Sequence, residues 1–216
     1  MSLGKRWTFD NSAFQRIDDP RARLDDDCMN GIAHLLLERH RGIEGDLCAY
    51  LSTFTVPELL KSSSPSQSIW RTIRPSQYWT KNKWLIPIHS RSLEHWALAV
   101  VDAKTRRIHL FDSLGSKSFL TEWLPRIQIV VTRLVKLAQD QGYTLASTTF
   151  LCLLDWSAQP LDIVRRQSND YDCGIWVLWV VAAVTRGFDY AYLEEKDIVR
   201  FRNYLARTIR SLPLLE

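Results

Sequence analysis

A cysteine followed by a glycine and an apolar run is the segment of this sequence best suited to chemistry. The run that begins at Cys173 and Gly174 is almost wholly apolar as far as Val184, which predicts a buried helix. The helix dipole favours the thiolate, the nucleophilic form of the cysteine. Backbone N–H groups at the helix start and the amide of Gln167 offer donors to an oxyanion. Taken alone, Cys173 is explained equally well as a small buried residue of a core helix.

A histidine and an aspartate in the middle of the chain have the types needed to activate that thiol. His95 precedes the apolar run Trp96–Val101, and Asp112 follows a second run, Arg107–Phe111. If the two runs pair as an antiparallel hairpin, the Asp112 carboxylate lies beside the His95 ring and orients it toward Cys173. Separately, a surface histidine and a turn cap explain these residues. Their occurrence together favours a cysteine peptidase.

The elements that position these residues follow the order helix, consecutive strands, helices, which is typical of an α+β fold rather than alternating βαβ units. We expect helices near residues 24–42, 119–139, 173–184 and 194–212, and strands near 84–88, 96–101, 107–111 and 150–154. Asp25, Asp26 and Asp27 supply a cap and first-turn carboxylates to the first helix. One domain over residues 24–216 then follows a polar N-terminal arm over residues 1–23.

Composition excludes several other classes of protein. The 216 residues are 46% hydrophobic and 24% charged, values that describe a globular chain and not a disordered or fibrous one. The net charge of +4 is spread without a dense basic cluster, so we expect no nucleic-acid partner. No apolar run approaches the roughly 18 residues of a membrane span, so we expect no membrane partner.

The four cysteines predict free thiols in a reducing, intracellular compartment. They are Cys28, Cys48, Cys152 and Cys173, and no pair has the CxxC or Cys/His spacing of a zinc site. The polar first ten residues do not resemble a secretory signal. We therefore expect no disulfide and no metal, and the proposed thiol chemistry needs no organic cofactor.

Taken together, these segments resemble the ubiquitin-like-protein-specific cysteine proteases, the SUMO/sentrin-specific protease family, with the adenoviral protease as a more distant relative. The resemblance runs from about Leu24 to about Tyr204 and includes, in the family's order, Leu24–Asn30, Ile86–His89, His95-Trp96, Phe111–Ser113 and Gln167–Gly174. The chain is also similar to protease domains of fungal transposon-derived proteins. The resemblance implies a papain-like cysteine peptidase fold, with a central, mostly antiparallel sheet packed by helices.

The resemblance also implies a role for each matching side chain. Cys173 matches the family's nucleophile and His95 its base. Asp112 matches the acid that orients the base, and Gln167 matches the oxyanion donor. No metal or cofactor is implied.

Two further residues match positions that contact the substrate, and Gly174 is assigned there from its residue type. Trp96 matches an aromatic residue that covers the Gly-Gly tail, where only glycine fits under a flat indole. Asp26 matches an acidic position against the modifier's body, and Gly174 allows close approach of a substrate carbonyl. The chain departs from the family at Arg23, where a Trp is usual, and in the lack of the Pro that often precedes the position of Gln167.

The implied function is hydrolysis after the C-terminal Gly-Gly of a SUMO-like modifier, free or conjugated, through a thioester. We expect a monomer in the nucleus or the cytoplasm. An acyltransferase with the same Cys-His-Asp set, as in bacterial acetyltransferase effectors, is one alternative, but we find no basic, phosphate-cradling segment for its cofactor. A module that binds the modifier without cleaving it is the other, and such a module does not need the complete set of four residues.

Overall fold

The computed structural model describes residues 9–61, 67–145, 156–161, 167–188 and 194–211. Its helices are α1 (Asn11–Asp18), α2 (Asp26–Arg39), α3 (Thr55–Lys61), α4 (Gln67–Ile73), α5 (Lys117–Asp140), α6 (Cys173–Thr185) and α7 (Glu195–Arg210). Its strands are β1 (Cys48–Tyr50), β2 (Lys83–Ser90), β3 (His95–Asp102), β4 (Arg107–Phe111) and β5 (Ser157–Pro160). Three short 3₁₀ helices cover Gly45–Leu47, Arg74–Ser76 and Tyr78–Thr80.

The strands form one mixed sheet in the order β1-β2-β3-β4-β5. The hairpins β2–β3 and β3–β4 are antiparallel, whereas the outer strands β1 and β5 pair in parallel with β2 and β4. The predicted α+β class is confirmed. The antiparallel part is the centre of the sheet, where short connections join consecutive strands, and the parallel pairs are reached through longer crossovers.

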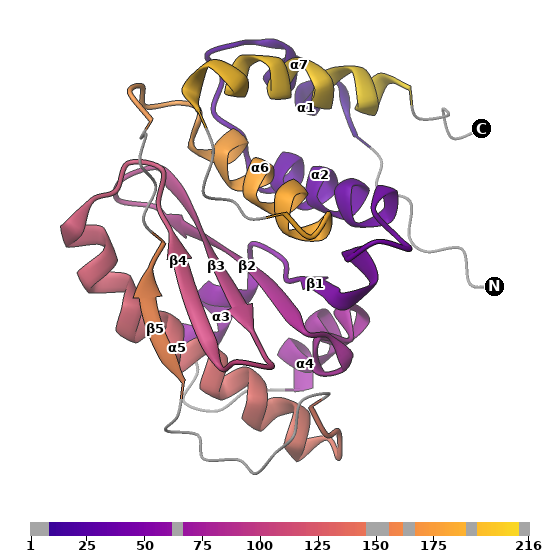
Figure 1. Cartoon of the computed structure of the whole chain (residues 1–216), viewed down its shortest axis with the longest axis vertical. Helices are drawn as coiled ribbons and strands as arrows, with labels where there is room; N and C mark the ends of the chain where they lie inside the picture. Colours follow the sequence, from indigo (N-terminus) through magenta and orange to yellow (C-terminus); the bar gives the residue numbers. More distant parts are fainter. Residues whose placement is uncertain (1–8, 62–66, 146–155, 162–166, 189–193, 212–216) are drawn as a thin grey trace.

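Helices cover both faces of the sheet because its central strand β3 is apolar on both faces. Its side chains alternate between two core clusters: Trp96, Leu98 and Val100 face one, and Ala97, Ala99 and Val101 face the other. Helices α1, α2, α6 and α7 lie on the first side, and α3, α4 and α5 lie on the second (Figure 1). A strand buried on both faces has no polar alternation, which explains its continuous apolar run.

The expected elements correspond closely to α2, α5, α6, α7, β2, β3 and β4. Unforeseen elements are α1, α3, α4, β1 and β5, which are too short to show a sustained period. The strand expected near 150–154 lies outside the described residues. Of the described helices, none combines the length and apolarity needed to cross a bilayer; α6 is apolar but has only 13 residues.

The segment assigned to an N-terminal arm contains a packed helix. Asp10 caps α1 by accepting a hydrogen bond from the Ala13 N–H at 2.8 Å. Ala13 and Ile17 are buried in the core cluster that also contains residues of α6 and α7. The boundary at residue 23 stays a prediction, and α1 packs on the domain that follows it.

Candidate active site

The hairpin of β3 and β4 brings His95 and Asp112 together. Leu98 pairs with Phe111 across the hairpin, so the residue after Phe111 lies near the start of β3. A hydrogen bond joins His95 Nε2 to Asp112 Oδ1 at 2.7 Å, and both side chains are buried. The sequence-based expectation of this contact agrees with the geometry, because the antiparallel register of two short strands leaves little choice of partner.

The Asp112 carboxylate is held by more than the histidine. Its Oδ1 accepts a hydrogen bond from the Leu114 N–H at 3.0 Å, and its Oδ2 accepts one from the Ser116 N–H at 2.7 Å. The edge of the His95 ring meets Phe119 at 5.6 Å between ring centroids. Backbone donors therefore fix the carboxylate, and the carboxylate and Phe119 fix the imidazole.

Cys173 is the first residue of α6 and its thiol reaches the same imidazole. Burial lowers the pKa of His95, but the hydrogen bond with Asp112, a hydrogen bond with Cys173 and the charges of Cys173 and Asp112 outweigh it and raise that pKa to about 9. Because Asp112 contacts Nε2, the ring's Nδ1 is the nitrogen left for the sulfur. Three side chains from β3, the end of β4 and the start of α6 thus converge.

The other described cysteines lie in different surroundings. Burial raises the pKa of Cys28 to about 12 and that of Cys48 to about 11, and both thiols are free. Such thiols stay protonated at neutral pH and are poor nucleophiles. Cys152 lies outside the described residues. Among the cysteines that the structure describes, Cys173 is the one whose thiol interacts with the His95–Asp112 pair, through the imidazole.

Gln167 lies in the turn of residues 167–172 that leads into α6. Its Oε1 accepts a hydrogen bond from the Ser113 hydroxyl at 2.8 Å, and its Nε2 donates to the Asn169 carbonyl at 2.6 Å. The Gln167 backbone N–H also donates to the Ser113 carbonyl at 2.9 Å. This turn is therefore tied to the residue that follows Asp112, which brings the predicted oxyanion donor to the site.

Trp96 is buried beside the site, and its indole contacts neighbouring residues. Its Nε1 donates to the Leu24 carbonyl at 2.8 Å, and one face of the indole stacks on His89 with 4.3 Å between ring centroids. Asp26, in the first turn of α2, is near enough to His89 to raise the pKa of that imidazole in part against the lowering effect of burial. Trp96, His89 and Asp26 thus form one cluster next to His95.

Gly174 lies where packing leaves little room for a side chain. A Cβ built on Gly174 lies 3.1 Å from both Leu24 Cβ and Met29 Sδ, which is tighter than an ordinary contact. The missing side chain lets the start of α6 approach the segment before α2. The sequence-based interpretation assigned this glycine to a close approach by substrate, and the geometry adds a close approach by the chain itself.

Arg23, which occupies the position where the family usually has a Trp, links the two sides of the site. One of its nitrogens pairs with Glu94, the residue before His95, and the other pairs with Asp170 at 2.9 Å, three residues before Cys173. The carboxylates are well exposed, so these ion pairs contribute about 1 kcal/mol or less each.

The chain that brings Cys173, His95 and Asp112 together is similar to known proteins. The Ulp1 protease family, C-terminal catalytic domain, matches residues 24–214. The chain belongs to this family. The predicted resemblance to the SUMO/sentrin-specific proteases is therefore confirmed, while the likeness to fungal transposon-derived domains stays a prediction.

Curated members of the Ulp1 family are longer than this chain. Sentrin-specific protease 2 of Rattus norvegicus is 30% identical over 156 residues, which cover 71% of this chain and 24% of that protein. Ubiquitin-like-specific protease 1A of Arabidopsis thaliana is 25% identical over 202 residues, or 89% of this chain and 38% of the relative. The chain therefore spans about a quarter to two fifths of these relatives.

Solved structures show the same fold. The SUMO protease Ulp1 with its catalytic cysteine oxidised to a sulfonic acid matches with a TM-score of 0.73 at 22% identity, covering 95% of this chain and 85% of that one. The Ulp1 protease domain in complex with Smt3, the yeast orthologue of SUMO, matches with a TM-score of 0.65 at 22% identity, covering 92% and 80%.

Sequence reasoning missed one buried pair of this Ulp1-family domain. No sequence motif relates Asp172 to Arg202, yet their side chains form an ion pair at 2.9 Å. A signal was present in α7, whose buried residues recur at helical spacing. Arg202 falls within that otherwise mostly apolar stripe, beside Phe201 and between Ile198 and Leu205. A charge at such a position indicates a buried partner.

Proposed function

We propose that this chain is a cysteine peptidase that hydrolyses the bond after the C-terminal Gly-Gly of a SUMO-like modifier. The observation that carries the proposal is the contact of His95 with both Asp112 and Cys173, which raises the pKa of the imidazole to about 9. At neutral pH the ring is then protonated, which favours a thiolate beside it. Membership of the Ulp1 family and the naming of its relatives as SUMO and sentrin proteases support the choice of substrate.

In the proposed reaction, the Cys173 thiolate attacks the carbonyl carbon of the modifier's last glycine. The carbonyl oxygen becomes an oxyanion, held by the backbone N–H of Cys173 and the amide of Gln167. The His95 imidazolium gives its proton to the leaving amine as the C–N bond breaks, which leaves a thioester. The neutral imidazole then takes a proton from water, the hydroxide displaces the sulfur, and the thiolate and imidazolium are restored.

We propose that the modifier's tail passes the cluster beside His95. Trp96 and Gly174 border the start of β3 and of α6, where a tail without side chains passes most easily. Asp26 supplies a carboxylate to the body of the modifier. Arg23 replaces the second aromatic group expected at this entrance, so we assign it a polar contact with the segment before the glycines.

The substrates include precursors and conjugates in this proposal, and the protein acts as a monomer in the nucleus or the cytoplasm. No nucleic acid takes part. An acyltransferase needs a surface for a phosphorylated cofactor, and the sequence offers no basic, phosphate-cradling segment for one. A non-cleaving binding module does not need the His95–Asp112 contact, so hydrolysis is the function that the geometry favours.

The test uses modifiers that carry an electrophile at the C-terminus, built on SUMO, ubiquitin and a Nedd-type modifier. We expect the wild-type protein to form a covalent adduct with the SUMO probe, detected by a mass shift. Cys173→Ala abolishes the adduct, whereas Cys28→Ala, which changes a buried thiol of high pKa, leaves it intact. Binding without an adduct would instead support a non-cleaving module, and acetyl transfer would support the acyltransferase.

A further inference from the structure

An arginine of the last helix contacts the residue that directly precedes Cys173. Arg202 Nη2 donates to Asp172 Oδ1 at 2.9 Å, and both side chains are more than nine-tenths buried. Charges so placed are strongly coupled, because removal of one leaves the other without a partner in a medium of low dielectric. The pair therefore holds the end of the 167–172 turn in one geometry.

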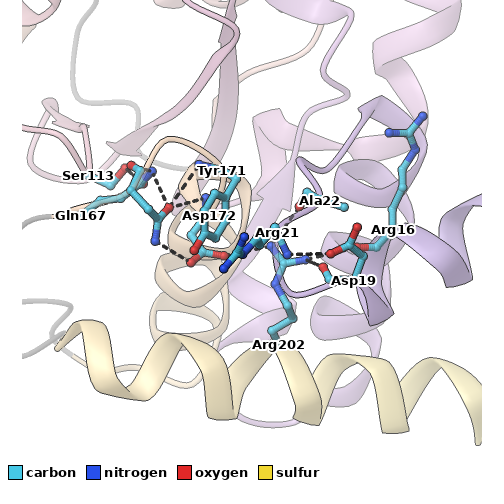
Figure 2. A network of polar contacts seen from close by, with 10 residues as sticks. Arg16, Asp19, Arg21, Ala22, Ser113, Gln167, Tyr171, Asp172 and Arg202 are labelled. Atoms are coloured by element: carbon cyan, nitrogen blue, oxygen red, sulfur yellow. Dashed lines mark hydrogen bonds and ion pairs between the residues drawn. The ribbon is translucent and has the colours of Figure 1, made fainter.

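The same guanidinium binds three backbone carbonyls. Its Nη1 donates to Arg16 at 3.2 Å and to Asp19 at 3.0 Å, and its Nη2 also donates to Ala22 at 3.0 Å. Figure 2 shows Arg202 rising from α7 between the Asp172 turn and the segment that leaves α1. A planar guanidinium makes such a set of contacts, whereas the single ammonium of lysine does not. Arg202 thus anchors Asp172 to a fixed frame.

The Asp172 carboxylate is turned away from the helix that it precedes. An Asp at the N-cap position usually accepts hydrogen bonds from N–H groups of the first turn. Asp172 occupies the N-cap position of α6 and, among the described residues, makes no side-chain cap hydrogen bond. Arg202 binds one carboxylate oxygen and Asn169 Nδ2 donates to the other at 2.9 Å. The N–H groups beside Cys173 are therefore left for another acceptor.

The contacts continue from Asp172 to the other side of the site. Asn169 Oδ1 accepts hydrogen bonds from the Tyr171 N–H at 3.1 Å and from the Asp172 N–H at 3.0 Å. The Asn169 carbonyl accepts the 2.6 Å hydrogen bond from Gln167 Nε2, and Gln167 Oε1 accepts the one from Ser113. One chain of polar contacts thus runs from α7 to the residue next to Asp112.

We propose that Arg202 is a positioning residue for the reaction at Cys173. Through Asp172 it keeps a carboxylate off the N–H groups that hold the oxyanion, and it neutralises a negative charge beside the thiolate. Through Asn169 it also holds Gln167. Arg202 touches no reacting atom, and its role rests on the proposed hydrolysis by Cys173.

The test compares variants of the full chain with a modifier carrying a fluorescent C-terminal leaving group. In Arg202→Met the released Asp172 carboxylate turns onto the first turn of α6. We expect kcat per titrated active site to fall about tenfold to a hundredfold, with KM little changed, because the acceptor site is misplaced while the binding surface is not. Asp172→Ala removes the carboxylate itself, so we expect a smaller loss than in Arg202→Met.

The double variant and a control distinguish positioning from general stability. Arg202→Met with Asp172→Ala should recover kcat relative to Arg202→Met alone, because no carboxylate remains to occupy the N–H groups. Arg210→Met removes a different ion pair of α7, with Asp18 of α1, and should leave kcat unchanged. If Arg202→Met lowers only the thermal midpoint and kcat is that of the wild type, the proposal is wrong. A double variant no better than Arg202→Met would contradict it as well.

Alkylation of Cys173 by iodoacetamide, followed on its own peptide by mass spectrometry, does not depend on the substrate. Should the wild-type protein hydrolyse no modifier, the proposed function fails, and the alkylation rate still tests the positioning role. We expect a slower rate in Arg202→Met and an unchanged rate in Arg210→Met. Equal rates in all three proteins would overturn the role of Arg202. Arg202→Lys, which keeps the charge but not the fork, replaces Arg202→Met if that variant does not fold.

Discussion

His95 has two partners that act in the same direction against burial. The environment of the ring disfavours a charge, yet the Asp112 hydrogen bond and the Cys173 contact together raise the pKa of the imidazole to about 9. A neutral residue at either position would remove part of that support. The two backbone hydrogen bonds to Asp112 leave its carboxylate in place whether or not the ring is charged.

Replacement of Asp112 by Asn separates these contributions. Asp112→Asn keeps the shape but removes the charge and offers the ring an amide, so we expect the pKa of His95 to fall and kcat to drop about a hundredfold or more. NMR titration of the His95 ring and steady-state kinetics measure the two effects. His109→Asn, outside the site, serves as the control. A pKa of His95 near 6.5 in the wild-type protein would contradict the expectation that its two partners raise that pKa.

The raised pKa of His95 also determines how the stability of the folded protein changes with pH. Because the pKa of folded His95 lies above its ordinary value of 6.5, protonation of the ring stabilises the folded state. This contribution is complete below about pH 6.5 and is lost as the pH rises through about 9.

At the scale of elements, the start of α2 determines where the entrance to the site lies. Asp25 accepts a hydrogen bond from the Cys28 N–H at 3.0 Å as the N-cap residue, and it also pairs with Arg16 of α1 at 2.8 Å. The residue before this cap, Leu24, supplies the carbonyl that binds Trp96 and packs against Gly174. The N-cap of α2 therefore holds Leu24, the residue that contacts both Trp96 of β3 and Gly174 of α6.

Asp25→Ala should lower the free energy of unfolding by about 1 kcal/mol, because the first N–H groups of α2 lose their acceptor. Asp27→Ala is the matched control, since Asp27 lies in the same first turn, is exposed and is not the cap. Urea denaturation of the two variants gives the comparison. Equal midpoints for both would show that the cap contributes nothing beyond the charge at the helix start.

At the scale of the whole molecule, the first and last described helices, α1 and α7, stabilise one another. α1 and α7 pack on one another, Arg210 pairs with Asp18, and Arg202 binds carbonyls at the end of α1 and beyond it. Ile17 is buried in the same core as α6. The region before residue 24 thus supports α7, and α7 supports the turn before Cys173.

Removal of residues 1–23 should therefore destabilise the domain and slow the reaction. The loss of Ile17 burial alone costs about 2 kcal/mol, and Arg202 loses its three carbonyl partners as well. Chemical denaturation and kcat of the shortened chain and of the 216-residue chain measure both effects. Equal stability and equal kcat in the shortened chain would mean that α1 is dispensable, as the prediction of an N-terminal arm implies.

The sequence by itself determined the elements whose patterns are local and the residues whose motif order is specific. The apolar runs of β3, β4 and α6 predicted these elements by their composition and length, and the short turn between β3 and β4 left their pairing nearly unique. This was enough to predict the α+β fold and the partnership of His95, Asp112 and Cys173.

Only the tertiary structure decided which distant polar groups pair. Asp172 and Arg202 lie far apart in the sequence, as do Arg23 and its two carboxylates, and no local pattern relates them. Strands β1 and β5 are likewise stabilised by the neighbours they pair with, not by their own composition. Such contacts depend on how the helices pack over the sheet, because burial leaves a charged side chain only the partners that packing brings within reach.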